Sequence, residues 1–345
     1  MKTSDFDYAL PPDLIAQQPL AQRDAARMLV LDRARSTMQH RSFTDLPACL
    51  RAGDLLVLND TKVIPARLLG RKPSGGQIEL LLVEELSPLR WLALAKPVKR
   101  LREGMEIVLA ENPKSLRALV EAKRDAGEVV VRFSGTEDLM SDLDRLGHTP
   151  LPPYIRGGVD QPVDRERYQT IFAQRAGAIA APTAGLHFTQ RTFEELARRS
   201  VTVQRLTLHV GLGTFKPVTA EDIEQHNMHT ERFDIPPDTA QAVNAAKRDG
   251  RRVVCVGTTT LRALESVGDD TGQVRAGPGE TNIFIHPPYK FRVADALLTN
   301  FHLPRSTLLM LVCAFASREM ALRAYEEAIR QRYRFYSYGD CMLIV

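Results

Sequence analysis

Residues 70 to about 147 interrupt an α/β pattern with a series of short apolar runs separated by turn signals. In chain order, the runs are Ile78–Val83, Trp91–Ala95, Met105–Leu109, Leu116–Val120 and Glu128–Phe133. Short strands bounded by glycine, proline and aspartate are typical of a small antiparallel barrel. We therefore predict that residues 70–147 form an inserted β-barrel domain.

On either side of this insertion, apolar runs of strand length alternate with helical patterns. Asp54–Asn59 and Arg252–Gly257 have the features of strands, whereas Pro237–Asp249 and Met320–Arg332 have those of helices. Alternation of this kind is typical of an α/β fold with helices packed on a sheet. The predicted fold class is a large mixed α/β domain, discontinuous in sequence and made of residues 1–69 and 148–345.

The composition limits the kind of protein further. A chain of 345 residues is long enough for two domains. It contains no run of about 18 apolar residues, and its first residues lack the apolar stretch of a signal peptide, so we expect no membrane association. The four cysteines are far apart and form no CxxC pair, so we expect neither disulfides nor a zinc site, and a cytoplasmic location. The ordinary surface makes a monomer our expectation.

Two glycine-rich runs, Ala181–Phe188 and Leu206–Phe215, combine histidines and threonines with strand-like apolar residues. A strand that ends in a glycine-rich turn opens onto a cleft at its carboxyl end. Glycine lets the backbone approach a ligand closely, and histidine exchanges protons near neutral pH. We therefore predict that these runs form the floor of an active site. The candidate residues are Thr183, His187, His209, Gly211, Gly213 and Thr214.

Residues 256–266 form the clearest strand–turn–helix pattern in the chain. The N–H groups in the first turn of a helix have no partners within it, so they can bind an anion or a carboxylate. Thr258 and Thr259 either contact such a ligand or only cap the helix. Arg262, three residues before Glu265, either pairs with the ligand or forms a surface ion pair.

Motifs for nucleotides and metals are missing. No GxGxxG run follows a strand and no Walker A sequence is present, so a dinucleotide-binding fold and nucleoside triphosphate hydrolysis are not supported. His226 and His229 are three residues apart and precede Glu231, but no third metal ligand is apparent. We predict no metal, and treat His229 and Glu231 as candidates for proton transfer.

The C-terminal part offers two further polar groups of residues. Asn300 and His302 lie in a loop that ends at a proline. Tyr338 and Asp340 lie in an aromatic run closed by a Gly-Asp turn. This run is either a final strand or a wall against a purine or a ribose.

Basic residues cluster in three places, although the net charge is only +4. Such a charge permits a nucleic-acid partner without requiring one, so the local clusters matter more than the total. Each cluster is either solvated surface or a phosphate-binding patch. The clusters are Arg67, Arg71 and Lys72; Lys96, Lys99, Arg100 and Arg102; and Arg323, Arg330, Arg332 and Arg334.

In combination, these stretches resemble the S-adenosylmethionine:tRNA ribosyltransferase-isomerase family of queuosine synthesis. The resemblance runs from Asp5 to Met342, and so many matches in one order are highly specific, although each alone is weak. The matching stretches include Asp5–Tyr8, Asn59–Val63, Pro65–Arg67, Glu166–Thr170, Ala181–Phe188, Leu208–Gly211, Gly213–Phe215, Met228–His229, Val256–Thr259, Thr299–Pro304 and Ser337–Asp340.

The resemblance implies an α/β domain with an inserted β-barrel, and a reaction in which S-adenosylmethionine donates its ribosyl group. The implied acceptor is the aminomethyl group of 7-aminomethyl-7-deazaguanine at the wobble position of a tRNA anticodon. The implied product is epoxyqueuosine in the tRNA, with adenine and methionine released. No metal and no cofactor beyond S-adenosylmethionine as co-substrate are implied.

The family's reaction also suggests roles for the candidate residues. Proton transfer is expected from His187, His209 and His229, with Glu231 as a second base. Substrate binding is expected from Thr183, Gly211, Gly213, Thr214, Thr258, Thr259, Arg262, Asn300, His302, Tyr338 and Asp340. Contacts to tRNA phosphates are expected from Arg67, Arg71, Lys72, Lys96, Lys99, Arg100 and Arg334.

Two other classes of protein fit part of the sequence. An S-adenosylmethionine-dependent RNA methyltransferase normally has a glycine-rich nucleotide loop, which this chain lacks. A non-enzymatic RNA-binding protein would use the barrel, but it leaves the histidines and threonines between Ala181 and Phe215 unexplained.

Overall fold

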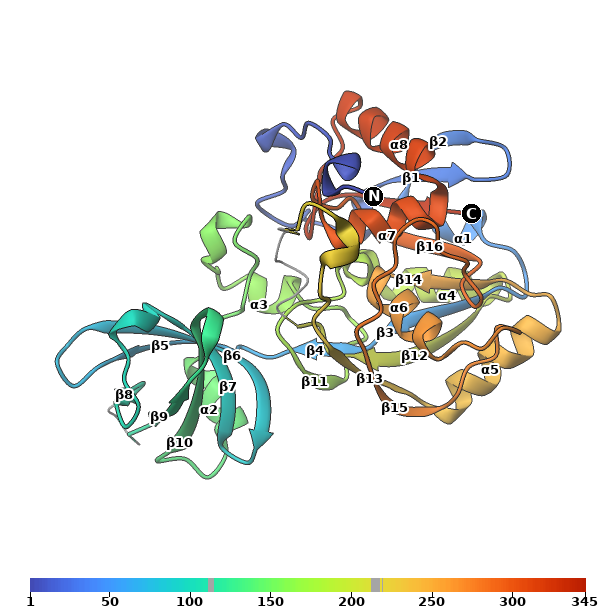
Figure 1. Ribbon diagram of the computed structural model, residues 1–345. Helices are drawn as coiled ribbons and strands as arrows, with labels where there is room; N and C mark the ends of the chain where they lie inside the picture. The colour runs from blue at the N-terminus through green and yellow to red at the C-terminus, as the bar shows by residue number, and fades with distance from the viewer. Residues whose placement is uncertain (111–114, 212–217, 219) are drawn as a thin grey trace.

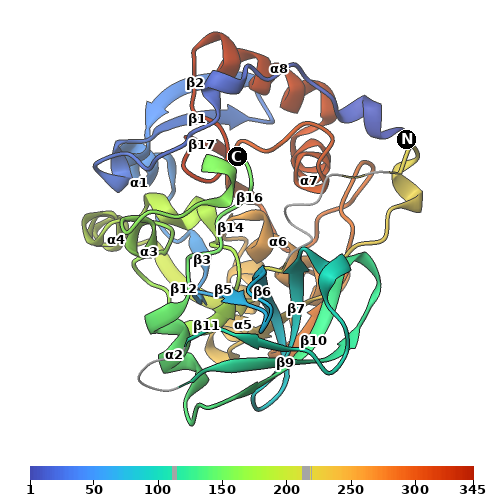
Figure 2. The same ribbon diagram turned by 90° about the vertical axis from the view of Figure 1, so that its left-hand side faces the viewer.

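A large α/β part and a smaller barrel lie side by side in the structure, a computed structural model (Figure 1). The structure describes residues 1–110, 115–211, 218 and 220–345. Both termini belong to the α/β part, and the barrel extends from one end of it (Figures 1 and 2). The predicted fold class, an α/β domain with a small antiparallel barrel inserted, is confirmed.

The α/β part is built on a nine-stranded mixed sheet. Four neighbouring strands in the middle of the sheet are parallel to one another. The strand beside them, which is the last strand of the chain, runs antiparallel to its neighbour among these four. Antiparallel pairs of strands also lie toward both outer ends of the sheet. In spatial order the strands are β15 (Gly277–Thr281), β13 (Glu231–Ile235), β12 (Thr202–Leu208), β3 (Leu55–Asn59), β14 (Val253–Val256), β16 (Ala296–Asn300), β17 (Cys341–Ile344), β1 (Arg27–Asp32) and β2 (Thr37–Ser42).

Helices cover both faces of this sheet, and the strands alternate their side chains accordingly. Leu55, Val57 and Cys255 pack into one apolar cluster, whereas Leu56 and Val254 pack into another on the opposite face. The first cluster includes residues of α5 (Pro237–Arg248), α6 (Thr258–Val267), α7 (Thr307–Ala316) and α8 (Arg318–Arg330). The second includes residues of α1 (Leu46–Cys49) and α4 (Gln190–Arg198). Both faces of the central strands are therefore buried, which explains their continuous apolar runs.

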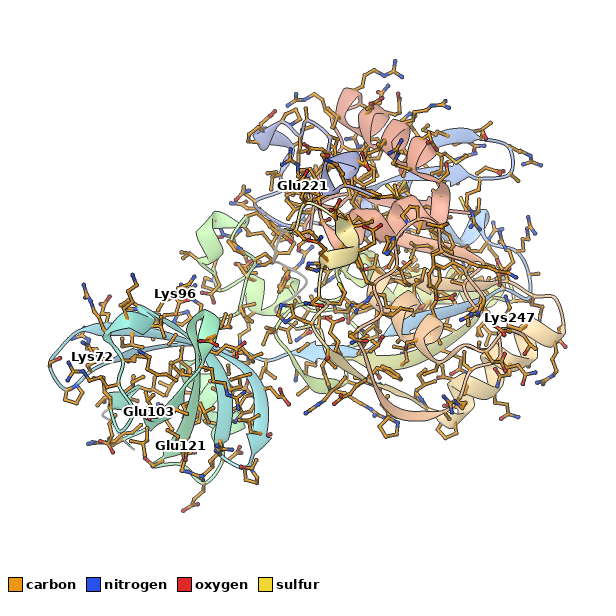
Figure 3. The ribbon with its side chains drawn as sticks, viewed as in Figure 1. Lys72, Lys96, Glu103, Glu121, Glu221 and Lys247 are labelled. Atoms are coloured by element: carbon orange, nitrogen blue, oxygen red, sulfur yellow. The ribbon has the colours of Figure 1, made fainter. Side chains whose placement is uncertain are left out.

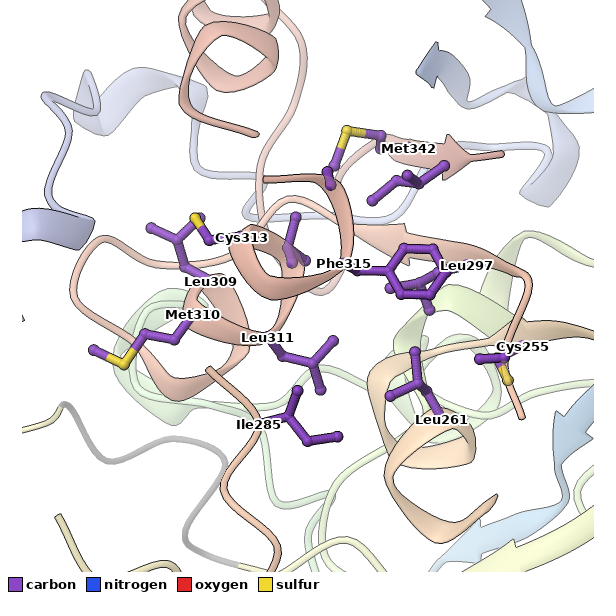
Figure 4. Close-up of a cluster of buried hydrophobic side chains, with 14 of the residues drawn as sticks. Cys255, Leu261, Ile285, Leu297, Leu309, Met310, Leu311, Cys313, Phe315 and Met342 are labelled. Carbon is purple, nitrogen blue, oxygen red and sulfur yellow. The ribbon is translucent and has the colours of Figure 1, made fainter. Parts of the chain in front are cut away.

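Figure 4 shows how the first cluster closes over the strands. Leu261 of α6 and Leu311 and Phe315 of α7 lie around Leu297 and Cys255 of the sheet. Because α6 begins directly after β14 and α7 shortly after β16, this packing fixes where both helices start. The starts of the two helices lie at the same edge of the sheet, where the parallel strands end.

The barrel is a closed ring of six antiparallel strands around its own apolar core. Its strands are, around the ring, β10 (Glu128–Ser134), β7 (Arg90–Lys96), β6 (Gln77–Ser87), β5 (Arg67–Arg71), β8 (Glu106–Val108) and β9 (Arg117–Lys123). The short helix α2 (Leu139–Leu146) follows the last strand, and its Leu139 and Leu143 pack into the barrel core. The predicted range 70–147 begins at a residue within β5. The five residues of β5 alternate between more buried and more exposed positions, and no clear turn signal precedes the strand in the sequence.

The two ends of the insertion meet in a narrow neck. The backbone of Arg67 pairs with that of His148, with N–H to carbonyl distances of 3.3 Å and 2.8 Å. A Cβ atom on Gly147 would lie 2.0 Å from the carbonyl oxygen of Pro65, so only glycine fits there. A two-stranded parallel sheet of β4 (Thr61–Val63) and β11 (Arg175–Ala178) lies on the α/β side of the neck.

One local expectation differs from the structure. The run Ala181–Phe188 does not form a strand; its residues Thr183–His187 form a short 3₁₀ helix, η8, close to α3 (Asp164–Arg167) in the α/β part. Glycine and proline in this run favour a turn over a ladder, because proline cannot donate to a neighbouring strand. The run nevertheless lies against the end of β16, with which η8 is in contact.

Candidate active site

A cavity opens where the central strands end. We call it the strand-end cavity. Small and hydroxyl-bearing residues predominate in its wall, and most come from the stretches that carry the family resemblance. They include Tyr154, Tyr168, Ala181, Thr183, Val210, Gly257, Thr258, Thr259, Thr299, Asn300, His302, Ser306, Tyr336 and Ser337.

Asn59, at the end of β3, holds the strand ends in register beneath this cavity. Its amide nitrogen donates to the carbonyl of Leu208 at 2.9 Å and to Thr259 Oγ1 at 3.2 Å. Its amide oxygen accepts from the N–H groups of Leu208 at 3.0 Å and Thr61 at 3.1 Å. A single buried side chain thus connects β3, β12 and α6, and all its donors and acceptors are used.

The N-terminus of α6 forms part of the cavity wall. Gly257 has a φ of 88° and precedes the helix without a side chain that could cap it. Thr258 and Thr259 follow in the first turn, and both line the cavity. Because first-turn N–H groups have no partners in the helix, the wall presents a site for a carboxylate or another anion.

Two predicted residues at the end of β16 also line the cavity. His302 Nε2 lies 2.7 Å from Thr299 Oγ1, and burial lowers the pKa of this imidazole to about 3. His302 is therefore neutral at physiological pH. The amide nitrogen of Asn300 donates to the carbonyl of Tyr336 at 2.9 Å, while its oxygen has no hydrogen-bond partner among the described residues.

His187 lies behind Asn300, outside the wall of the strand-end cavity. The residue is 5% exposed, and burial lowers its pKa to about 4 although the side chain of Asn300 acts in the opposite direction. The positive charges of Arg334 and Arg23 lower the pKa further. Its Nε2 atom has no hydrogen-bond partner in the described part of the chain. A neutral, unsatisfied imidazole therefore adjoins the cavity.

Sequence reasoning missed several aromatic and hydroxyl residues of this wall. The hydroxyl groups of Tyr154 and Ser337 are 2.8 Å apart, and burial raises the pKa of Tyr154 to about 12. Tyr154 follows two prolines that resemble a hinge, so the sequence did not indicate that it lines a cavity. Tyr168 lies in one of the stretches that match the family, so a signal for it was present.

A second cavity lies between the barrel and the α/β part, and we call it the interdomain cavity. The barrel contributes Glu84, Glu85 and Trp91 to its wall. The sheet edge contributes a histidine, carboxylates and small residues: Ala176, Gly177, His209, Val210, Gly211, Thr230, Glu231, Arg232 and Glu280. Val210 lines both cavities, so they are neighbours.

His209 follows the last residue of β12 and is half-buried in the interdomain cavity. Its Nδ1 atom lies 2.9 Å from Thr61 Oγ1, and burial lowers its pKa, with Asp60 acting in the opposite direction. A Cβ atom on Gly177 would lie 2.9 Å from the imidazole. Gly177, with a φ of 143°, therefore provides the space in which the ring is held.

Glu231 and Arg262 form a buried ion pair at the edge of the interdomain cavity, with side chains that are 4% and 5% exposed. Glu231 also accepts from the N–H of Gly211 at 3.2 Å, and Arg262 donates to the carbonyl of Ile283 at 3.3 Å. The carboxylate that Arg262 contacts is thus the protein's own.

The remaining predicted substrate residues lie apart from both cavities or outside the described residues. His229 is exposed, next to Thr230 of the interdomain wall. Tyr338 donates to Asp164 at 2.6 Å, and Asp340 accepts from the N–H groups of Arg27 and Arg334, both at 2.8 Å. Gly213 and Thr214 lie outside the described residues.

The predicted tRNA-binding residues differ in how they are held. Arg67 donates to the carbonyl of Gly158 at 2.5 Å and pairs with Glu79 at 2.9 Å, so it ties the barrel to the segment that follows. Arg334 is half-buried in the α/β part. The others lie on the barrel, where Lys72 and Lys96 occupy one side and Glu103 and Glu121 another (Figure 3). They are Arg71, Lys72, Lys96, Lys99 and Arg100, of which all but Lys72 are exposed.

Two other kinds of feature are missing from the described residues. Within these residues, no three or more histidine, cysteine, aspartate or glutamate side chains are grouped so that they could hold a metal ion. In the same residues, no helix is long and apolar enough to cross a membrane.

Comparison with known proteins identifies the family. Residues 3–344 match the family described as "Queuosine biosynthesis protein". Proteins from Symbiobacterium thermophilum and Geobacter metallireducens, both named S-adenosylmethionine:tRNA ribosyltransferase-isomerase, are each 51% identical over 346 residues, with 100% of both chains covered. These matches favour the predicted family over a methyltransferase or a non-enzymatic binding protein.

A solved structure supports the same assignment. The crystal structure of S-adenosylmethionine tRNA ribosyltransferase from Thermotoga maritima is similar with a TM-score of 0.56 and 37% sequence identity, and covers 99% of this chain and 100% of its own. The predicted resemblance is therefore confirmed along the whole length of the sequence. This chain belongs to the queuosine biosynthesis protein family, whose members from bacteria such as Symbiobacterium thermophilum are S-adenosylmethionine:tRNA ribosyltransferase-isomerases.

Proposed function

We propose that the protein transfers and isomerises the ribosyl group of S-adenosylmethionine onto 7-aminomethyl-7-deazaguanine in the wobble position of tRNA. Adenine and methionine leave, and the tRNA carries epoxyqueuosine. We propose further that the protein works as a cytoplasmic monomer without a metal or another cofactor. The observation that carries the proposal is the pair of adjoining cavities, because the reaction brings together two chemically different substrates.

The strand-end cavity suits S-adenosylmethionine. Thr258 and Thr259 at the start of α6 provide N–H and hydroxyl groups for the methionine carboxylate, and Thr183 faces the same space. The neutral imidazole of His302 and the amide of Asn300 provide hydrogen bonds for adenine or the ribose. Among the described residues, no lysine or arginine lines this cavity, so none of them places a like charge beside the positive sulfonium.

The interdomain cavity suits the acceptor base. Its wall contains the carboxylates of Glu84, Glu85 and Glu280, of which Glu84 and Glu280 pair with Arg232. The carboxylate of Glu85 in the same wall matches a positive aminomethyl group. Trp91 borders the same space from the barrel, where its side chain packs into the apolar core. Since Val210 borders both cavities, the base and the ribosyl donor can meet.

His209 is the proton acceptor that we propose for the acceptor amine. The amine attacks only when it is uncharged, so its proton must move to a base within reach. His209 lines the interdomain cavity, and its lowered pKa keeps it neutral at physiological pH. Thr61 fixes the ring through Nδ1, which leaves Nε2 to face the substrate.

The test is to incubate the protein with S-adenosylmethionine and tRNA carrying 7-aminomethyl-7-deazaguanine, and to follow the products by mass spectrometry. We expect equal amounts of adenine and methionine, and a matching gain of mass in the tRNA nucleoside. S-adenosylhomocysteine as the product would indicate methyl transfer instead and would overturn the proposal.

A variant then tests the assigned base. His209→Gln should lower kcat about 10²- to 10⁴-fold, the usual contribution of a positioned general base. The control is His40→Gln, because His40 is a half-exposed histidine on β2 at the outer edge of the sheet. An active His209→Gln enzyme would remove this role and leave the overall reaction in place.

A further inference from the structure

A third and smaller cavity lies beside the strand-end cavity, and Ser337 lines both. Its other wall residues come from the N-terminal segment, α3, η8 and the turn before β17: Pro19, Leu20, Arg23, Arg167, Leu186, His187, Tyr338 and Gly339. Arg334 lies close by, near enough for its charge to lower the pKa of His187. We call this space the guanidinium pocket, after Arg23, Arg167 and Arg334.

The three guanidinium groups donate only to backbone carbonyls in the described structure. Arg23 donates to the carbonyl of Glu166 at 2.9 Å, and Arg167 to that of Leu20 at 2.6 Å. Arg334 donates to the carbonyl of Gln18. None of the three forms an ion pair with any described residue, whereas the neighbouring Arg27, Arg156 and Arg332 pair with Asp340, Asp164 and Asp13.

The carboxylates of Glu166 and Asp340 affect the pKa values of Arg23 and Arg334 without forming ion pairs with them. Glu166 raises the pKa of Arg23, and Asp340 that of Arg334, but in both arginines burial has the larger effect and lowers the pKa. Asp340 is also occupied by Arg27 and by two backbone N–H groups. Arg23 and Arg167 repel each other, as the lowered pKa of Arg23 reflects. The cluster therefore carries more positive charge than its surroundings neutralise.

Buried nitrogen atoms without a hydrogen-bond partner among the described residues lie in or beside the same pocket. His187, 5% exposed, lines the pocket, and its Nε2 atom has no hydrogen-bond partner in the described part of the chain. The same holds for Arg167 Nε and Arg334 Nη1. Leaving such groups unpaired costs stability, and a bound water or ion is one way in which that cost is met.

We propose that the guanidinium pocket binds one oxyanion, and that this oxyanion is a backbone phosphate of the tRNA. Planar guanidinium groups match the oxygens of a phosphate, and the pocket is too small for a base. Pro19 and Leu20 of the pocket wall belong to a segment whose Gln17, Gln18, Ala21 and Gln22 are exposed, so an RNA backbone can approach this segment. The inference rests on the proposed function, since it takes tRNA as the substrate.

The first experiment measures tRNA binding at several salt concentrations for Arg23→Gln and Arg334→Gln. Each should weaken binding about 10- to 100-fold, as expected for the loss of a hydrogen bond to a charged group. Each should also reduce the slope of log K against log salt by about 1, the signature of a lost phosphate contact. Affinity for S-adenosylmethionine, measured by equilibrium dialysis, should not change.

The matched control is Arg33→Gln. Arg33 is half-buried, its pKa is also lowered by burial, and it donates only to the backbone carbonyls of Val345, Phe315 and Asp295. It lies beyond the other end of β1, away from the three cavities. An equal loss of tRNA affinity in Arg33→Gln would mean that the arginines only hold the backbone together, which would overturn the proposal.

A second experiment needs no variant that could fail to fold. Anticodon stem-loop RNAs, each with one neutral methylphosphonate in place of a phosphate, are bound to the unaltered protein. With the unaltered protein, a methylphosphonate at one position should lower the affinity of the RNA. With Arg334→Gln, the RNA that carries this methylphosphonate should bind as tightly as the unmodified RNA. If no single position matters, the pocket holds no phosphate and the proposal fails.

Two further outcomes separate the sources of the oxyanion and the two proposals. If the arginine variants lose affinity for S-adenosylmethionine and keep that for tRNA, the pocket binds the methionine carboxylate, and the assignment to tRNA is overturned. All these measurements record binding and not turnover. Failure of the enzyme to release adenine would therefore count against the proposed reaction alone.

Discussion

The two parts of the molecule differ most in what they bury. Among the described residues between 67 and 147, no polar or charged side chain is buried. The sheet edge of the α/β part, in contrast, buries Asn59, Glu231, Arg262 and Asn300 within a short distance of two cavities. Burying polar groups costs free energy unless each is paired. The difference indicates that the chemistry belongs to the α/β part, while the barrel provides a stable apolar body with a charged surface.

The largest expected effect concerns the ion pairs of the two parts. Glu231→Gln leaves Arg262 buried without its counter-charge, so we expect a loss of about 3–5 kcal/mol in the free energy of unfolding. The comparison variant is Glu121→Gln on the barrel, where Glu121 pairs with Arg90 at 2.6 Å near solvent, and we expect little change. Urea unfolding measures both. Equal losses would mean that burial does not distinguish the two parts.

The second prediction concerns pH. The folded protein holds the pKa of His187 at about 4, below the usual value near 6.5, so the unfolded chain binds a proton more readily. Stability should therefore fall as the pH is lowered from about 6.5 to about 4, by about 3 kcal/mol from His187 alone. His302, with a pKa of about 3, adds to the same trend.

The barrel lacks this sensitivity, because residues 67–147 contain no histidine. Trp91 is the only tryptophan of the chain and belongs to β7, so its fluorescence reports on the barrel. Hydrogen exchange of the central strands reports on the α/β part. We expect protection of those strands to decrease between pH 6.5 and 4 before the fluorescence changes. A simultaneous change would show that the two parts unfold as one unit.

The smallest effect is expected where the barrel closes. Gly70 lies in β5, and a Cβ atom there would be 2.7 Å from Ile107 Cγ2 and 2.8 Å from Leu109 Cδ2. Gly70→Ala should therefore destabilise the barrel by about 1–3 kcal/mol through overpacking. Leu69→Ala is the control, since Leu69 is 52% exposed on the same strand. Trp91 fluorescence during urea unfolding measures the stability of both variants. If Gly70→Ala were as stable as the unaltered protein, the strands β5 and β8 could move apart to make room for the methyl group.

Much of the fold follows from local sequence. The predicted strands Trp91–Ala95 and Glu128–Phe133 correspond to β7 and β10 to within a residue or so at each end, because alternation and turn residues act locally. The helix predicted at Pro237–Asp249 is α5 for the same reason. In contrast, β5 and α2 escaped prediction, since each depends on packing against the barrel core as much as on its own pattern.

The site was only partly predictable, because spacing along the chain does not give distance in space. Thr258, Thr259, Asn300 and His302 meet at one cavity since they end or follow neighbouring strands, which the strand–turn pattern indicated. The partnership of Glu231 with Arg262 depends on the order of strands in the sheet, which no local pattern reveals. The same is true of the guanidinium pocket, whose arginines come from three distant segments.

The neck between Arg67 and His148 bears on how such a chain could assemble. A long insertion normally raises the entropy cost of closing the host chain around it, and the cost grows with the number of residues in the loop. Here the paired backbones of Arg67 and His148 bring the ends of the insertion together once the barrel has folded. The strands of the α/β part are then joined by a short connection in place of a flexible loop of about eighty residues. An evolving gene could therefore exchange the barrel for another module with adjacent ends and keep the sheet beneath it.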